Sequence, residues 1–226
     1  MYKIVKLSYD IDEGTPLYPG TPPLKIEKVK EINKGDSCNT SLITFSNHSG
    51  THIDAPRHFL DSGKGTKDYP ANKLVYKKPV IIDCPKRPGE VVLPEDLSGL
   101  RLEKDVDALL IRTGSYKHRS SEPEKYRNEN PSISPEAADW IRRNLLNLKI
   151  VGIDSISISS KMRKGDGVKA HKTLLTDKEY RGDPVLILED LYLPSELKRV
   201  GELLIFPVFK ADIDSSPCVV IGLIDE

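Results

Sequence analysis

The sequence shows no excess of charge of either sign, because 34 Lys and Arg residues balance 34 Asp and Glu residues. Nucleic acids and anionic membrane surfaces normally select proteins with a basic excess. We therefore expect neither nucleic acid nor a membrane as a partner, and we interpret the short basic run at residues 116–119 as a solvated loop. No apolar stretch in the sequence approaches the roughly 20 residues that a membrane-spanning helix needs.

Cysteine is scarce as well: the chain has three, Cys38, Cys84 and Cys218, far apart and without a CxxC pair. This spacing excludes a zinc ribbon and a thioredoxin-like redox motif. An odd number of separated cysteines is typical of buried thiols in a reducing compartment. The first residues contain no apolar segment long enough for a signal peptide. We therefore expect a cytoplasmic protein.

Strand-like runs dominate the chain, whose 226 residues lie at the upper end of what one domain usually holds. The runs are rich in Val, Ile and Leu and are bounded by Pro, Gly, Asp or Asn. They lie at residues 4–9, 24–32, 40–46, 79–83, 107–112, 148–154, 185–188, 203–209 and 218–224. With fewer helices between them, they predict a single α/β domain over residues 1–226.

The clearest helix signal begins at Ser134, an N-cap residue followed by Pro135 and by an acid in the first turn, and it runs to about Leu146. We expect a second, shorter helix around residues 171–175 and a third around 193–197. Residues 114–133 are polar and charged with few aliphatic side chains. This composition predicts an exposed excursion, either a lid or a disordered loop.

Three of the five histidines fall within residues 47–59, and an aspartate stands among them; imidazole and carboxylate are the usual ligands of zinc and related metals. In a helix, Asp54 would lie roughly 240° away from His48, and Gly50 and Pro56 also oppose a helix. An extended chain points residues 48, 52, 54 and 58 to one face, but separates the Cα atoms of residues 48 and 52 by roughly 13 Å. The spacing therefore predicts a turn at Gly50, a short strand presenting His52 and Asp54, and a loop that holds His58.

Residues 48–59 satisfy every fixed position of the pattern HxGTHxDxPxHF. In this segment the sequence closely resembles the cyclase-like metal hydrolase family, which includes bacterial kynurenine formamidases and isatin hydrolase. Weaker matches at residues 18–20, 110–113, 151–154, 171–175 and 188–191 extend the resemblance over nearly the whole chain. The resemblance implies a mixed, barrel-like β-sheet flanked by a few helices, and assembly as a homodimer or a higher homo-oligomer.

The same resemblance implies roles for particular residues. The implied metal ligands are His48, His52, Asp54, His171 and Glu189. The first three would bind one zinc or manganese ion, and the last two would bind a second ion that shares Asp54. His58 would transfer protons, and Tyr18 would line the substrate pocket. Apart from the resemblance, we expect Thr51 to orient the groups around the metal, because it stands beside a ligand.

The leading functional interpretation is a metal-dependent hydrolase of a small amide that works by metal-activated water. Its expected activity is that of an arylformamidase, which converts N-formyl-L-kynurenine to L-kynurenine and formate in tryptophan catabolism. One alternative is a hydrolase that opens a cyclic amide or a lactone, as isatin hydrolase does. A second alternative, from a different class, is a non-catalytic relative that binds a metal or a ligand.

Overall fold

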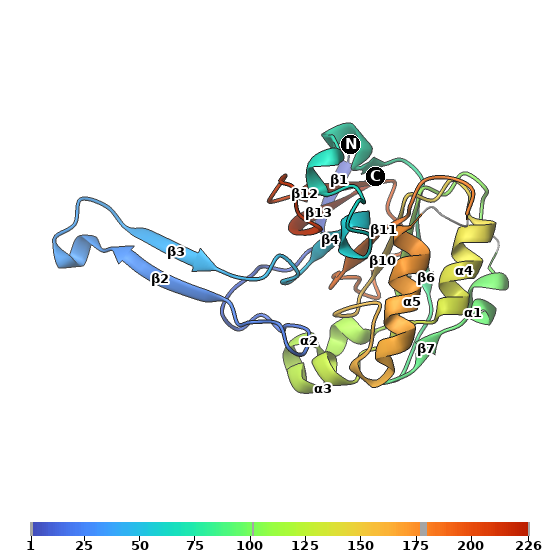
Figure 1. Ribbon diagram of the computed structural model, residues 1–226, viewed down its shortest axis with the longest axis horizontal. Helices are drawn as coiled ribbons and strands as arrows, with labels where there is room; N and C mark the ends of the chain where they lie inside the picture. The colour runs from blue at the N-terminus through green and yellow to red at the C-terminus, as the bar shows by residue number, and fades with distance from the viewer. Residues whose placement is uncertain (1, 101, 177–179, 226) are drawn as a thin grey trace.

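The computed structural model describes residues 2–100, 102–176 and 180–225. Within these residues a nine-stranded mixed sheet runs in the order β5-β12-β13-β4-β11-β10-β8-β6, and β1 also pairs with β13. The sheet curls into a barrel-like shape with helices along one side (Figure 1). The strands are β1 (Tyr2–Lys6), β4 (His52–Asp54), β5 (Val75–Tyr76), β6 (Pro79–Asp83), β8 (Ala108–Arg112), β10 (Ile150–Ile153), β11 (Leu186–Glu189), β12 (Glu202–Pro207) and β13 (Ser215–Asp225).

The parallel strands β8, β10 and β11 are buried on both faces, which explains their continuous aliphatic sequences, and β6 pairs with β8 at the partly exposed edge of the sheet. Side chains such as Leu109 and Val151 pack under α1 (Pro94–Ser98), α4 (Pro135–Asn144) and α5 (Lys164–Leu175). Their neighbours Leu110 and Ile150 join a second core with residues of β4, β12 and β13. Helix α4 begins as expected, because the Ser134 hydroxyl accepts a hydrogen bond from the Ala137 N–H at 3.0 Å.

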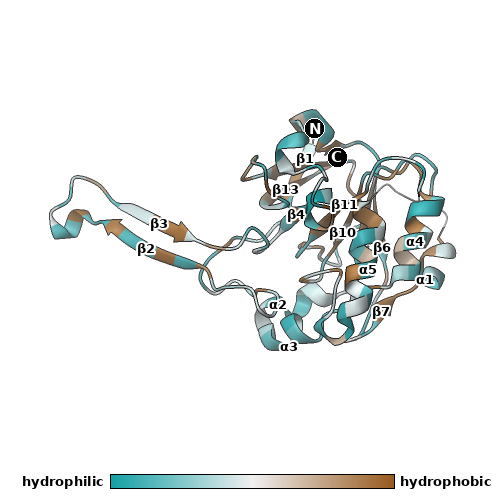
Figure 2. Cartoon of the chain, viewed as in Figure 1, coloured by the Kyte–Doolittle hydropathy of each residue, from teal (hydrophilic) through white to brown (hydrophobic). Residues whose placement is uncertain are grey.

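A two-stranded arm projects from this body (Figure 1). It consists of β2 (Lys25–Lys30) and β3 (Thr40–Thr44), whose residues are all exposed. Figure 2, coloured by hydropathy, shows hydrophobic residues on both strands of the arm. Cys38 is exposed near the tip of the arm, so the expectation of buried thiols holds for Cys84 and Cys218 and is wrong for Cys38.

All nine predicted strands are present, and the expected mixed, barrel-like α/β sheet is confirmed. The helix expected around residues 171–175 is part of the longer α5. The helix expected at residues 193–197 is wrong, because the segment forms one turn closed by the Leu197 N–H and the Pro194 carbonyl at 3.0 Å. The guanidinium of Arg112 donates to the Pro194 and Leu197 carbonyls, at 2.7 Å and 2.6 Å, and holds the segment in this shape.

The prediction of an exposed excursion at residues 114–133 is also wrong. The segment contains α2 (His118–Ser121), α3 (Pro123–Asn128) and β9 (Ser132–Ile133), which pairs with β7 (Val91–Val92). Tyr126 and Arg119 are buried, so residues 116–119 are not a fully solvated loop. The polar composition predicted exposure, but Arg119 can be buried because it has a carboxylate partner elsewhere in the chain. Among the helices described, none has the length and apolar character needed to cross a membrane.

Candidate metal centre

The predicted turn at Gly50 is present. Gly50 has a φ of 63°, in the left-handed region that favours glycine. A Cβ atom there would lie 2.9 Å from the Ile11 side chain, so glycine is needed for space as well. The turn folds the chain back until the ring centroids of His48 and His52 are 5.1 Å apart.

The strand β4 then presents His52 and Asp54 on one face, as its alternation requires. In the neighbouring strand β11, Glu189 pairs directly with His52 in the antiparallel register. A short 3-10 helix, Pro56–His58, ends β4 and carries His58. The predicted strand and the predicted position of His58 are therefore confirmed, and the sheet register adds Glu189 to them.

Two backbone carbonyls fix the orientation of the buried imidazoles. The Nδ1 atom of His52 donates to the Gly50 carbonyl at 2.8 Å, and the Nδ1 atom of His171, on α5, donates to the Gly167 carbonyl at 2.8 Å. Because a carbonyl only accepts, each Nδ1 carries the hydrogen when the ring is neutral. Each Nε2 then offers its lone pair to the centre of the cluster, the arrangement that metal-binding histidines commonly show.

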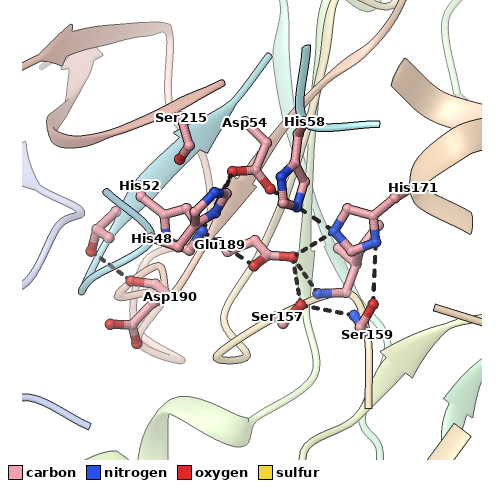
Figure 3. A network of polar contacts seen from close by, with 12 residues as sticks. His48, His52, Asp54, His58, Ser157, Ser159, His171, Glu189, Asp190 and Ser215 are labelled. Carbon is pink, nitrogen blue, oxygen red and sulfur yellow. Dashed lines mark hydrogen bonds and ion pairs between the residues drawn. The ribbon is translucent and has the colours of Figure 1, made fainter. Parts of the chain in front are cut away.

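The ligand atoms of this cluster converge on two carboxylates (Figure 3). His48 Nδ1 lies 3.1 Å and His52 Nε2 lies 3.5 Å from Asp54 Oδ1. The two oxygens of Glu189 lie 3.4 Å from His52 Nε2 and 3.4 Å from His171 Nε2. Two ligands of one tetrahedral zinc ion, each about 2.0–2.1 Å from it, are about 3.3 Å apart. The spacing therefore suits a shared metal ion.

Unpartnered atoms at the centre point to the same conclusion. Among the described residues, His52 Nε2 and both carboxylate oxygens of Asp54 are buried without a hydrogen-bond partner. Two overlapping sets of possible ligands contain Asp54, one with His48 and His58 and one with His52 and Glu189. Buried polar atoms normally have partners, so the residues present fit a divalent cation.

The histidines and carboxylates of the cluster stabilise each other's charged forms. Burial lowers the pKa of His48, but Asp54 and Asp214 outweigh burial and raise the pKa to about 10. Burial raises the pKa of Asp54, but the adjacent His48 and His52 hold it well below its usual range. Burial likewise raises the pKa of Glu189, but the two histidines beside it lower the pKa to about 2. Protons on the imidazoles thus supply positive charge that balances the carboxylates, as a bound divalent cation would.

Asp214 is a member of the site that the sequence analysis missed. Its Oδ2 atom accepts hydrogen bonds from His48 Nε2 at 2.8 Å and from His58 Nδ1 at 2.9 Å. Its Oδ1 atom accepts from Asn47 Nδ2 at 2.7 Å. The residue precedes β13, where Ser215 pairs with Asp54 in the antiparallel register. That pairing over a long sequence separation brings Asp214 to the cluster, and a single sequence does not display it.

A pocket of about 590 Å³ lies over the cluster. Tyr18 lines it, in the position that the resemblance implied, and Phe59, Ile156 and Val168 supply apolar walls. Small-molecule sites are usually concave and largely apolar, with a few polar groups that orient the ligand. The structure thus brings together the residues expected to bind metal, transfer protons or line the pocket: His48, His52, Asp54, His58, His171, Glu189 and Tyr18.

Comparison with known proteins gives the family. The family model described as "Putative cyclase" matches residues 5–160. A kynurenine formamidase of Geobacillus thermodenitrificans (strain NG80-2) is 30% identical over 215 residues, which cover 94% of this chain and 93% of the relative. A kynurenine formamidase of Erythrobacter litoralis (strain HTCC2594) is 26% identical over 217 residues, which cover 96% of this chain and 91% of the relative. The chain belongs to this cyclase family, and the resemblance of residues 48–59 is confirmed.

Solved structures share the fold. Isatin hydrolase A from Labrenzia aggregata, bound to benzyl benzoate, superposes with a TM-score of 0.81 at 23% identity, and the match covers 100% of this chain and 94% of that one. A predicted metal-dependent hydrolase from Bacillus stearothermophilus superposes with a TM-score of 0.75 at 24% identity, with 99% and 98% covered. At these identities the likeness establishes the fold.

Proposed function

We propose that the protein is a metal-dependent hydrolase that cleaves a carbon–nitrogen bond, other than a peptide bond, in a small amide. Its activity in this proposal is that of an arylformamidase, which converts N-formyl-L-kynurenine and water to L-kynurenine and formate in tryptophan catabolism. One observation carries the proposal: the unpartnered ligand atoms of His52 and Asp54 lie beneath a pocket sized for a small molecule. The kynurenine formamidases among its relatives support the choice of a formamide.

The metal would be held by His48, His52 and Asp54, with His171 and Glu189 holding a second ion that shares Asp54. We propose Zn²⁺, with Mn²⁺ as the alternative, at one or two ions per chain. When bound, such an ion lowers the pKa of water to about 7 and polarises the carbonyl of the substrate. The histidine nitrogens and carboxylate oxygens present are ligands that suit both metals.

His58 is the proton-transfer residue in this proposal. Its Nδ1 atom donates to Asp214, so Nε2 of the neutral ring is available to accept a proton from the attacking water. The imidazolium then returns this proton to the amine nitrogen as the C–N bond breaks. The free amine and formic acid leave, and the acid releases the second proton of the water to solvent and becomes formate. Tyr18 and Phe59 line the pocket in which the aromatic part of the substrate would lie.

Ring opening of a cyclic amide is a second candidate function. The same ligands, proton-transfer residue and pocket would serve it, because the reaction again adds water to an amide carbonyl. The apolar side chains of Phe59 and Ile156 in the pocket lining suit a bicyclic amide such as isatin. A lactone would need no further catalytic group.

The β2–β3 arm supports assembly as a homodimer, which we propose as well. An isolated two-stranded hairpin is marginally stable in water, yet the arm and the segment that joins its strands expose five large apolar residues: Ile26, Val29, Ile32, Leu42 and Ile43. The body exposes a second apolar group close to the root of the arm: Phe206, Val208, Phe209 and Val219. In a two-fold dimer each arm would cover the apolar group of the other copy, and such an isologous contact closes on itself.

We further propose that residues 1–226 act as one domain and that the protein is cytoplasmic. A single sheet carries both hydrophobic cores, which supports one folding unit. The three cysteines are free thiols, which suits a reducing compartment.

Metal content and turnover test the proposed function together. Wild type, His52→Ala and the control His118→Ala, whose ring pairs with Glu122 outside the cluster, are analysed for zinc and manganese. They are then assayed with N-formyl-L-kynurenine, isatin and a lactone. We expect one or two metal equivalents in wild type and the control, a loss in His52→Ala, and turnover of the formamide. Bound metal without turnover would favour the non-catalytic alternative, and no metal in any protein after incubation with both ions would overturn the proposal.

A further inference from the structure

The turn after Glu189 has an unusual backbone. Asp190 is the one non-glycine residue with a positive φ, 55°, in the described part of the chain. Residues with a Cβ atom rarely adopt this region, although aspartate and asparagine tolerate it better than most. Such residues persist where the surrounding structure holds them, and they cluster at functional sites. The residues that hold Asp190 in place therefore also affect the position of Glu189, the proposed metal ligand next to it.

Two residues of the segment 114–133 hold the Asp190 side chain. The Arg119 guanidinium donates two hydrogen bonds to its carboxylate, each 2.8 Å long, and the Tyr126 hydroxyl donates a third at 2.5 Å. Arg119 also lies over the ring of Tyr9, 3.7 Å from the ring centroid. Asp190 is 1% exposed and Arg119 is 7% exposed. Because so deeply buried an ion pair gains little over two apolar side chains, stability alone does not account for it.

The backbone of Asp190 joins the ends of three strands. Its carbonyl accepts a hydrogen bond at 2.6 Å from the hydroxyl of Thr51, the residue before His52. Its N–H donates at 2.8 Å to the carbonyl of Ser155, just beyond β10. Figure 3 shows Asp190 next to Glu189, with its carboxylate directed away from the histidines. A shift of this residue would therefore move Glu189 directly and His52 through Thr51.

We propose that Arg119 and Asp190 are positioning residues for the metal centre. Their ion pair holds the left-handed turn that directs Glu189 and, through Thr51, steadies His52. This inference rests on the metal site of the proposed function. It also assigns a role to residues 114–133, because Arg119 on α2 and Tyr126 on α3 both bind the side chain of Asp190.

Metal affinity distinguishes positioning from a purely structural role. Metal-free protein is titrated calorimetrically with Mn²⁺ and with Zn²⁺, and the Tm of each metal-free variant is measured in parallel. Asp190→Asn keeps the shape of the side chain and its tolerance of a left-handed φ, but turns an amide N–H toward Arg119. We expect its affinity to fall about 10–100-fold, the usual cost of losing a group that orients a metal ligand. Tyr126→Phe removes one of the three hydrogen bonds and should lose less.

The matched control is Arg112→Met. Arg112 is another buried arginine, and it bonds to the carbonyls of Pro194 and Leu197 and to Asp83, away from the cluster. Its loss should lower the Tm and leave the metal affinity within about twofold, since it orients no ligand.

Removal of the Asp190 charge alone leaves Arg119 buried without a counter-charge, which destabilises a protein strongly. The double variant Arg119→Met/Asp190→Asn removes both charges and is measured beside the single ones. Wild-type affinity in this folded double variant would overturn the positioning role and leave the hydrolase proposal intact. A wild-type protein that binds neither metal would overturn both.

Discussion

The carboxylate of Asp214 accepts a hydrogen bond from His58 Nδ1 at 2.9 Å across a separation of 156 positions in the chain. The same oxygen accepts from His48 Nε2 at 2.8 Å. Asp214 therefore joins the proposed proton-transfer residue to a proposed metal ligand. Both hydrogen bonds, that of His48 first, hold the pKa of Asp214 well below its usual range, so the carboxylate stays charged at neutral pH.

Asp214→Asn should lower kcat by about 100-fold or more, because an asparagine side chain can turn its N–H toward His58 and favour the wrong tautomer for proton transfer. The assay is run at saturating metal, so that any weakening of the His48 contact does not limit turnover. Asp212→Asn is the control, since Asp212 pairs with Arg57 and Lys67 at the surface. Equal loss in both variants would contradict the role of Asp214.

His58→Ala should lower kcat by about 10²–10⁴-fold, the usual contribution of general acid–base catalysis, and leave the metal content unchanged. His58 also lies close enough to His48 and Asp54 to belong to a possible ligand set. Elemental analysis of the variant separates these two roles. Loss of metal together with activity would make His58 a ligand, and unchanged turnover would exclude it from both roles.

The stability of the metal-free protein should depend on pH at both ends of the scale. The pKa of Glu189 falls from 4.5 to about 2, because its two histidine neighbours outweigh its burial. Its contribution is therefore complete above about pH 4.5 and is lost as the pH falls through about 2. The pKa of His48 rises from 6.5 to about 10. Its contribution is complete below about pH 6.5 and is lost as the pH rises through about 10.

The Tm of metal-free protein, measured from pH 2 to pH 11, should accordingly be highest between about pH 4.5 and pH 6.5. Glu189→Gln should reduce the loss of Tm at acid pH without abolishing it, because the pKa values of Asp54 and Asp214 are lowered too. It should also reduce the loss at alkaline pH, because Glu189 raises the pKa of His171 and of His52. In the metal-loaded protein the fall of the Tm at alkaline pH should be smaller, because an imidazole that binds a metal is already neutral. A metal-free Tm that does not change between pH 6.5 and pH 10 would contradict the pairing of His48 with its carboxylates.

Local pattern was sufficient for the histidine segment. The shared parity of residues 48, 52, 54 and 58, together with one glycine, predicts the turn and the short strand that the structure contains. The capping signal at Ser134 likewise predicts the start of α4. In both places the determining interactions lie within a few residues of each other, where a single sequence displays them.

Long-range pairing set the limit of sequence analysis. Asp214 reaches the site through the register of β13 against β4, and no sequence pattern near residue 214 predicts that register. Arg119 looked like a solvated charge, because its carboxylate partner, Asp190, lies 71 positions away. The turn at residues 193–197 depends on Arg112, which lies 82 positions from Pro194. In these three places, the decisive polar group has a partner that only the fold supplies.

The exposed apolar face of the arm leads to a prediction about assembly. Ile26 and Ile43 are directly opposite each other in the antiparallel register, so they form one apolar pair on one face of the arm. At the root of the arm, the ring of Phe45 lies 5.9 Å from that of Phe209, which makes the apolar surface of the arm continuous with that of the body. Charges placed on the pair should prevent a second copy from covering it, because burial of an unpaired charge is costly.

We expect wild type to elute as a dimer, and Ile26→Asp/Ile43→Asp to elute as a monomer, in size-exclusion chromatography with light scattering. Leu146→Asp is the matched control, since Leu146 is a large apolar residue exposed beyond the end of α4, away from the arm. Circular dichroism and Tm measurements establish that each variant is folded, which the arm variant should be, because its altered side chains contact solvent in the single chain. A dimer that survives both arm substitutions would place the interface elsewhere, and a monomeric wild type would contradict the homodimer itself.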